Sequence, residues 1–285
     1  MCGPFKSLRN CLKLVEIIFS ALAFIIVLFR GRMVNPYGIW CEFVWLFCVV
    51  VPLVILVMEL MKWNVLLAAF LPPWDDLTCG LTMLCTLMII SATIIFAVLF
   101  ACSYCIISIL CVIFSLIATV AFLVDAVMSK MKCPRGYLSN CRGVLRFTEA
   151  WVACIIITAA ASYFLQLEKR FHHPAMIFCV VIYVVCLLAT VFIIILHLLK
   201  LLRCLLTFGM EILELVFNVV AVLLYVIAVI LWAVYGFRYY NTYHPLHYCR
   251  YCTYKDMMVV LIGSIVNLVL YIVDLVLSIL AKLKA

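Results

Sequence analysis

Long runs of hydrophobic residues alternate along the chain with short segments that carry charge or proline. Each of eight runs has about the 20 residues that a helix needs to cross a bilayer. The runs are continuous rather than alternately polar and apolar, so they predict helices and not the strands of a membrane barrel. We therefore expect an all-α fold, a polytopic membrane protein with eight transmembrane helices. The predicted spans are 12–29, 40–60, 77–99, 104–128, 146–165, 175–199, 210–235 and 257–280.

The composition excludes several classes of protein. Hydrophobic residues make up 71% of the 285 residues and charged residues 11%, whereas a soluble domain is roughly half apolar and a quarter charged. Eight spans use about 160 residues, which leaves no room for a large ectodomain or a tethered soluble enzyme. The first run, preceded by Lys6 and Arg9, also has the outline of a signal peptide. Glu16 interrupts that run and no small-residue cleavage site follows it, so we keep it as the first span.

Basic residues predict the orientation, because short loops rich in Lys and Arg stay in the cytoplasm. With the N-terminus inside, 13 of the 20 basic residues fall in cytoplasmic segments. We therefore expect a multi-pass membrane protein with both termini cytoplasmic.

An internal repeat divides the chain. LRNCLKLVE around Lys13 and Glu16 recurs as CRGVLRFTE around Arg146 and Glu149, and the motif FCVV occurs in both the second and the sixth span. The fourth and eighth spans each carry one acid, Asp125 in LVDAV and Asp274 in IVDLV. These anchors predict two parallel four-helix halves, residues 1–132 and 133–285.

Four segments of the second half carry a family resemblance: LRFTEAWVACIIITAA, PAMIFCVVIYVVCLLA, LLYVIAVILWAVYGF and VNLVLYIVDLVLS. With Glu149, Trp232, Tyr235 and Asp274 as landmarks, they resemble the myeloid-associated differentiation marker family of tandem MARVEL-domain proteins. The resemblance implies a four-helix MARVEL bundle in each half and no enzymatic activity. It also implies a role in organising ordered, cholesterol-rich regions of cell-surface and vesicular membranes.

Charged residues inside the spans are the first candidate site. Acids within a membrane are costly and suggest ion relays, but here they lie within about two turns of the predicted cytoplasmic ends, at 1.5 Å per residue. We interpret them as two equivalent polar clusters that hold each bundle together, with Asn218 and Asn267 adding interhelical hydrogen bonds. Contact with partners or lipid headgroups, and ion coupling, are the alternatives. The intramembrane clusters comprise Lys13, Glu16, Asp125, Arg146, Glu149 and Asp274.

Cysteines and tyrosines mark the predicted outer loop between the last two spans. Cys249 and Cys252 form a C-x2-C pair that predicts a disulfide, either with each other or with Cys41 or Cys102. A redox pair, or a zinc site completed by His244 and His247, is the alternative reading of the same residues. Aromatic residues at this position favour the lipid headgroup region, or else anchor another protein. The contact candidates are Tyr239, Tyr240, Tyr243, Tyr248, Arg250 and Tyr251.

The link between the halves is basic and carries Cys133 and Cys141. Basic residues beside anionic lipid each contribute about 1 kcal/mol of attraction, and cysteines close to a membrane are candidate palmitoylation sites. The alternative is that this link only sets the topology.

These features favour a non-enzymatic membrane organiser, for which we expect no catalytic residues, metal or cofactor. The expected partners are membrane lipids, including cholesterol and anionic lipids, other membrane proteins and a second copy of the chain, but not nucleic acid. A channel or transporter is the first alternative, supported by the parallel repeat and the buried acids. The second is a junction or adhesion component, suggested by the GIW-C motif at Gly38–Cys41.

Overall fold

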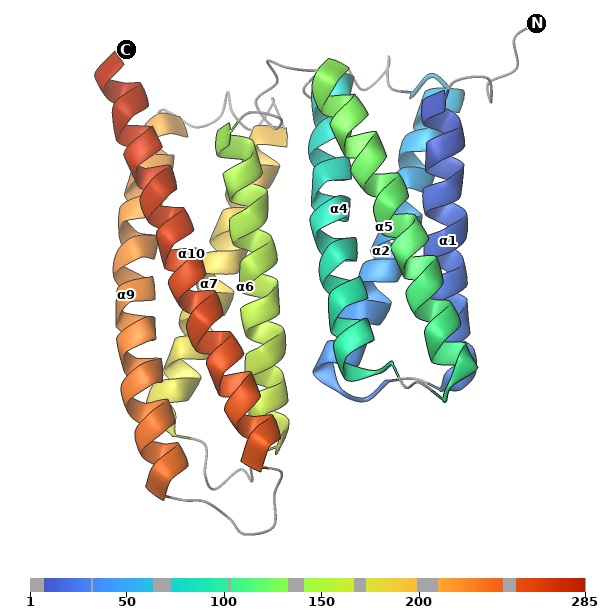
Figure 1. The fold of residues 1–285 in the computed structure, drawn as a ribbon. Coiled ribbons are helices and arrows are strands. Elements are labelled where there is room, and N and C mark those ends of the chain that lie inside the picture. The colour runs from blue at the N-terminus through green and yellow to red at the C-terminus, as the bar shows by residue number, and fades with distance from the viewer. Residues whose placement is uncertain are drawn as a thin grey trace, which may run out of the picture. The chain divides into compact units, whose positions relative to one another are not determined.

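A computed structural model describes residues 8–31, 33–63, 73–101, 104–132, 141–166, 173–198, 210–242 and 250–284. Within these residues the structure has eight helices that are long and apolar enough to cross a membrane (Figure 1). The all-helical, eight-span prediction is therefore confirmed. The helices are α1 (Leu8–Arg30), α2 (Pro36–Leu60), α4 (Trp74–Leu99), α5 (Ile106–Lys132), α6 (Cys141–Gln166), α7 (Pro174–Leu198), α9 (Met210–Thr242) and α10 (Arg250–Lys284).

Most helices extend beyond the predicted spans, because a polar residue ends an apolar run without ending the backbone hydrogen bonding. The start of α2 shows the local reason: the Asn35 side chain accepts a hydrogen bond from the Tyr37 N–H at 3.0 Å, with Pro36 in the first turn. Asp75 and Asp76 occupy the first turn of α4, where carboxylates favour a helix N-terminus.

The Tyr-rich stretch 235–256, predicted to be a loop, is partly helical. Residues 235–242 continue α9, and residues 250–256 already belong to α10. The loop prediction was therefore wrong for these residues, because tyrosine, arginine and asparagine all tolerate helical backbone once the helix has started.

The chain divides into two compact units, unit 1 (Met1–Val144) and unit 2 (Leu145–Ala285). In unit 1 each helix packs against two neighbours, in the circular order α1, α2, α4, α5 and back to α1. The predicted domain boundary between residues 132 and 133 lies in the segment before α6.

Unit 2 has the corresponding neighbours. Helix α7 packs against α9, and α9 against α10. Helix α6 meets α10 where a Cβ added to Gly263 would lie 2.8 Å from Ile156 Cγ1, and it meets α7 where Tyr163 Oη lies 3.9 Å from Met176 Sδ. The small residue at 263 lets two helix backbones approach closely, which is a common way of packing helices in lipid.

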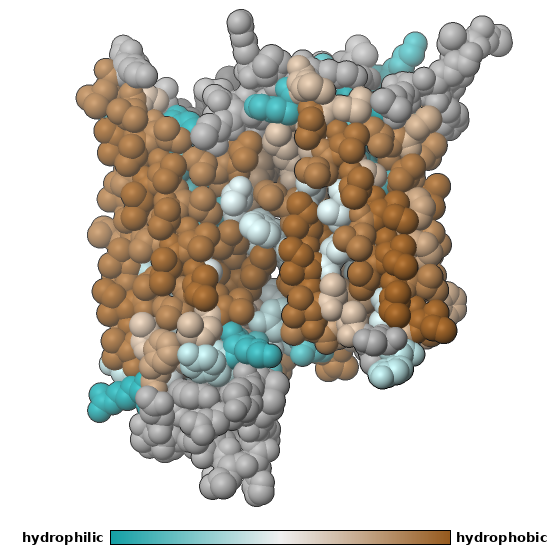
Figure 2. Space-filling view, in the orientation of Figure 1, coloured by the Kyte–Doolittle hydropathy of each residue, from teal (hydrophilic) through white to brown (hydrophobic). Residues whose placement is uncertain are grey.

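The surface of the helices is dominated by hydrophobic side chains in the middle of the molecule (Figure 2). Leu, Val and Ile are the main exposed large side chains, for example Leu116 and Val120 on α5 and Val185 and Leu188 on α7. Several polar and charged residues of the helices, Lys13 among them, are instead buried inside their units. This inverted distribution is expected where the surrounding solvent is lipid.

Candidate functional site

The unit 2 cluster consists of Arg146, Glu149, Asn218, Asp274 and Ser278. Arg146 Nη2 lies 2.7 Å from Asp274 Oδ2, and Arg146 Nη1 lies 3.2 Å from Glu149 Oε2. Arg146 Nη2 also donates to Asn218 Oδ1 at 2.7 Å, and Asn218 Nδ2 donates to Asp274 Oδ2 at 2.9 Å and Ser278 Oγ at 3.2 Å. These contacts connect α6, α9 and α10 through short hydrogen bonds.

Two further contacts surround this cluster. The Arg146 guanidinium lies over the Phe217 ring, 5.3 Å from its centroid, which adds a cation–π attraction. His197 Nε2 of α7 lies 2.8 Å from Glu214 Oε1 of α9, and both side chains are buried. The same end of all four helices of unit 2 is therefore linked by polar contacts.

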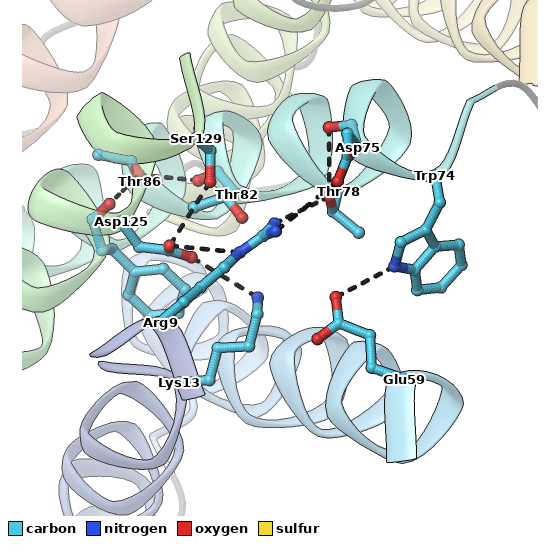
Figure 3. Close-up of polar contacts among 11 residues, drawn as sticks. Arg9, Lys13, Glu59, Trp74, Asp75, Thr78, Thr82, Thr86, Asp125 and Ser129 are labelled. Carbon is cyan, nitrogen blue, oxygen red and sulfur yellow. Dashed lines mark hydrogen bonds and ion pairs between the residues drawn. The ribbon is translucent and has the colours of Figure 1, made fainter. Parts of the chain in front are cut away.

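The unit 1 cluster consists of Arg9, Lys13, Glu16, Asp75 and Asp125 and lies at the corresponding ends of α1, α4 and α5. Figure 3 shows Arg9, Lys13, Asp75 and Asp125 of this cluster. Lys13 Nζ lies 3.6 Å from Asp125 Oδ2, and Arg9 Nε lies 3.9 Å from Asp125 Oδ1. Arg9 Nη1 lies 3.9 Å from Asp75 Oδ1. The ion pairs of the unit 1 cluster are therefore longer than those of the unit 2 cluster.

Arg9 links the buried part of the unit 1 cluster to the surface. Its Nη2 donates to Thr78 Oγ1 at 2.9 Å, and Thr78 Oγ1 donates in turn to the Asp75 carbonyl oxygen at 3.2 Å. The Asp75 side chain is 74% exposed, whereas the Lys13 and Asp125 side chains are 0% exposed. The cluster thus extends from exposed to fully buried positions.

Several buried atoms of unit 1 have no hydrogen-bond partner among the protein groups of the structure. Both carboxylate oxygens of Glu16 belong to this group, although only 1% of the residue is exposed. The others are Arg9 Nε, Lys13 Nζ, Ser20 Oγ and Asp125 Oδ2. In unit 2 the residue at the repeat position of Glu16 is Glu149, whose Oε2 is hydrogen-bonded to Arg146 while its Oε1 lacks a partner.

The structure thus brings Lys13 together with Asp125, and Arg146 with Glu149 and Asp274. The functional roles predicted for these residues stay predictions. Cys133, Cys249, Tyr243 and Tyr248 lie outside the described residues, as do the side chains of five predicted site residues that are helical in backbone. These five are Cys141, Tyr239, Tyr240, Arg250 and Tyr251.

The predicted disulfide also depends on residues outside the described part of the chain. The backbone of Cys252 belongs to α10, but its side chain is not described. Cys41, one alternative partner, is a buried free thiol whose Sγ lies 3.5 Å from the Ala92 carbonyl oxygen. The pairing of Cys249 and Cys252 stays a prediction.

A set of buried tyrosines in unit 2 was not predicted from the sequence. Tyr225 Oη accepts a hydrogen bond from Asn267 Nδ2 at 2.6 Å. Tyr183 and Tyr271 make comparable contacts with Ser264 and Thr190, both at 2.8 Å. The signal was available, because Tyr271 and Asn267 are four residues apart in α10 and therefore share a helical face.

Unit 1 carries an apolar groove of about 410 Å³ between α1 and α5. Its lining is aliphatic and comes from both helices. The lining residues are Leu12, Val15, Leu116, Ile117, Val120, Ala121 and Val124.

Comparison with known proteins identifies a matching domain family and several relatives. The model of the MARVEL family, described as a membrane-associating domain, matches residues 137–277. Myeloid-associated differentiation marker-like protein 2 of Xenopus laevis is 29% identical over 278 residues, which cover 93% of this chain and 89% of the relative. The human protein of the same name is 27% identical over 296 residues, covering 97% of this chain and 92% of the relative.

A third relative, the myeloid-associated differentiation marker homolog of Xenopus laevis, is 28% identical over 202 residues, covering 68% of this chain and 64% of the relative. No solved structure matches the chain significantly. The eight membrane-length helices and the domain match define a multi-pass MARVEL-domain membrane protein. Within that class, the chain is similar over most of its length to proteins of the myeloid-associated differentiation marker family.

Proposed function

We propose that this protein is a non-enzymatic organiser of ordered, cholesterol-rich membrane regions and of neighbouring membrane proteins. The observation that carries the proposal is the placement of charge. Lys13, Asp125, Arg146 and Asp274 are buried and contact one another within their units, while the exposed side chains of the helices are mainly aliphatic. A body of this kind interacts with its surroundings through its lipid-facing surface.

The groove between α1 and α5 gives this proposal a specific location. Its aliphatic side chains favour a rigid apolar molecule over a solvated one, because burial of apolar area is the main attraction available there. We propose that an ordered lipid such as a sterol binds in the groove. The basic link around residues 130–146 would add attraction for anionic lipid on the cytoplasmic side. In this proposal both termini lie on the cytoplasmic side, and the protein resides in plasma and vesicular membranes.

The groove can be tested with a photoreactive sterol in membranes that contain the full chain. Val120, which is 60% exposed, lines the groove, so the Val120→Trp substitution should fill it and reduce crosslinking to α1 and α5. Val54 of α2 is 48% exposed and does not line the groove, so Val54→Trp is the matched control. Equal crosslinking in both variants would contradict binding at this groove.

The organising role needs a separate measurement. In vesicles that separate into ordered and disordered phases, the full chain should concentrate in the ordered phase, and Val120→Trp should reduce that enrichment more than Val54→Trp does. Residence in the disordered phase would contradict the proposal. Flux of an ion through reconstituted protein that is lost in Asp274→Asn would instead favour the channel or transporter alternative.

A further inference from the structure

The two polar clusters occupy repeat positions but differ in how closely their charges approach. In unit 2 the Arg146–Asp274 contact is 2.7 Å and the Arg146–Glu149 contact is 3.2 Å. In unit 1 the Lys13–Asp125 contact is 3.6 Å, and both contacts of Arg9 with carboxylates are 3.9 Å. N–H···O hydrogen bonds have distances of about 2.7–3.2 Å, so the ion pairs of unit 1 are not direct hydrogen bonds.

Three buried polar residues of unit 1 share one face of a helix. Lys13, Glu16 and Ser20 lie three and four residues apart and therefore share one face of α1. All three are buried, and the polar atoms of all three lack a hydrogen-bond partner among the protein groups. Asp125 of α5 contributes its Oδ2 to the same set and lies 3.6 Å from Lys13 Nζ.

Buried polar groups are rarely left unpaired, because an unpaired group loses its hydration without replacement. The atoms of this set include donors on Lys13 and acceptors on Glu16 and Asp125, with Ser20 able to act as either. A ligand that satisfies them all must both donate and accept hydrogen bonds. Water does so, and buried waters typically make about three hydrogen bonds to groups of this kind.

We propose that unit 1 contains an internal water site bounded by Lys13, Glu16, Ser20 and Asp125. Arg9 and the exposed carboxylate of Asp75 connect this site to the aqueous surface through successive contacts of 3.9 Å. Contacts longer than about 3.5 Å are the ones that water commonly bridges. Water thus supplies in unit 1 the hydrogen bonds that Arg146 and Asn218 supply in unit 2.

The repeat provides a matched pair of reporters for this site. Cys48 and Cys179 occupy the same place in the two FCVV motifs, and both are 0% exposed. Each thiol contacts a backbone carbonyl, that of Cys85 at 3.7 Å and that of Ala228 at 3.6 Å. Cys48 lies in unit 1 with the proposed water site and Cys179 lies in unit 2, so Cys48 is the reporter and Cys179 the control.

The test is X-ray radiolytic footprinting of the full chain in lipid nanodiscs. Irradiation converts bound water to hydroxyl radicals that oxidise adjacent side chains, and mass spectrometry against an unirradiated sample measures the oxidation. We expect several-fold more oxidation of Cys48 than of Cys179. Equal oxidation of the two thiols would overturn the proposal.

Variants separate water from other causes of oxidation. Glu16→Met should remove part of the site and lower Cys48 oxidation toward the level of Cys179, while Glu149→Met should leave Cys48 oxidation unchanged. Unchanged Cys48 oxidation in Glu16→Met would overturn the proposal. If Glu16→Met does not fold, judged by increased oxidation of Cys41, a buried thiol of unit 1, then Glu16→Gln replaces it and should lower Cys48 oxidation by a smaller factor.

Discussion

The Arg146 guanidinium lies 2.7 Å from the Asp274 carboxylate and so joins the first helix of unit 2 to its last. The two residues are 128 positions apart, and the contact closes the ring of helices at one end of the bundle. Because Arg146 also binds Glu149 and Asn218, the loss of its main partner cannot be neutral.

Asp274→Asn should lower the free energy of unfolding of the full chain by about 3 kcal/mol, the lower end of what the loss of one partner of a buried ion pair costs. The lower end applies because Glu149 still neutralises Arg146. The measurement is denaturant-induced unfolding in mixed micelles. Asp75→Asn is the control: its side chain is 74% exposed, so its effect should stay within about 0.5 kcal/mol. Equal effects of the two substitutions would contradict a stabilising role for the unit 2 cluster.

Reciprocal exchange of the basic residues should give unequal results. Arg146→Lys puts a single ammonium in place of a planar guanidinium that binds three groups. This substitution should lower the free energy of unfolding by about 2 kcal/mol. Lys13→Arg should cost less, because Lys13 makes no direct hydrogen bond that the exchange could break. Unfolding of both variants in the same micelles checks the order, and a larger loss for Lys13→Arg would show that the unit 1 cluster is the more tightly bonded one.

The sequence predicts much of this architecture but little of its bonding. Continuous apolar runs are sufficient to predict eight helices, because lipid requires each span to satisfy its own backbone. The spacing of Lys13 and Glu16, repeated at Arg146 and Glu149, also puts a basic residue one turn before an acid in each half. The spacing does not predict that Asn218 completes one cluster or that Glu16 lacks a protein partner. Both features depend on side chains contributed by other helices.

The hydroxyl groups of the buried tyrosines of unit 2 should differ in how much they contribute to the free energy of unfolding. Tyr225→Phe removes the acceptor for Asn267 Nδ2 at 2.6 Å and leaves a buried amide unpaired, which costs about 1–3 kcal/mol. Tyr163→Phe removes a longer contact, 3.9 Å to the Met176 sulfur, and should cost less. Both side chains are almost fully buried, so the ring packing is matched. Thermal unfolding of the two variants distinguishes them, and a similar loss in both would mean that the hydroxyl of Tyr225 contributes little.

Gly263 should not accept a side chain, because α6 packs closely against α10 there. A Cβ at this position would lie 2.8 Å from Ile156 Cγ1, closer than carbon atoms pack in protein interiors. Gly263→Ala should therefore cost about 1–3 kcal/mol through overpacking, even though alanine favours a helix by about 1 kcal/mol over glycine. In a chain that already carries Ile156→Ala, the same substitution should cost less or become stabilising, because the clash is gone and only the helix preference remains. A double-mutant cycle on the free energy of unfolding measures this coupling, and additive effects would show that the two helices separate freely to make room.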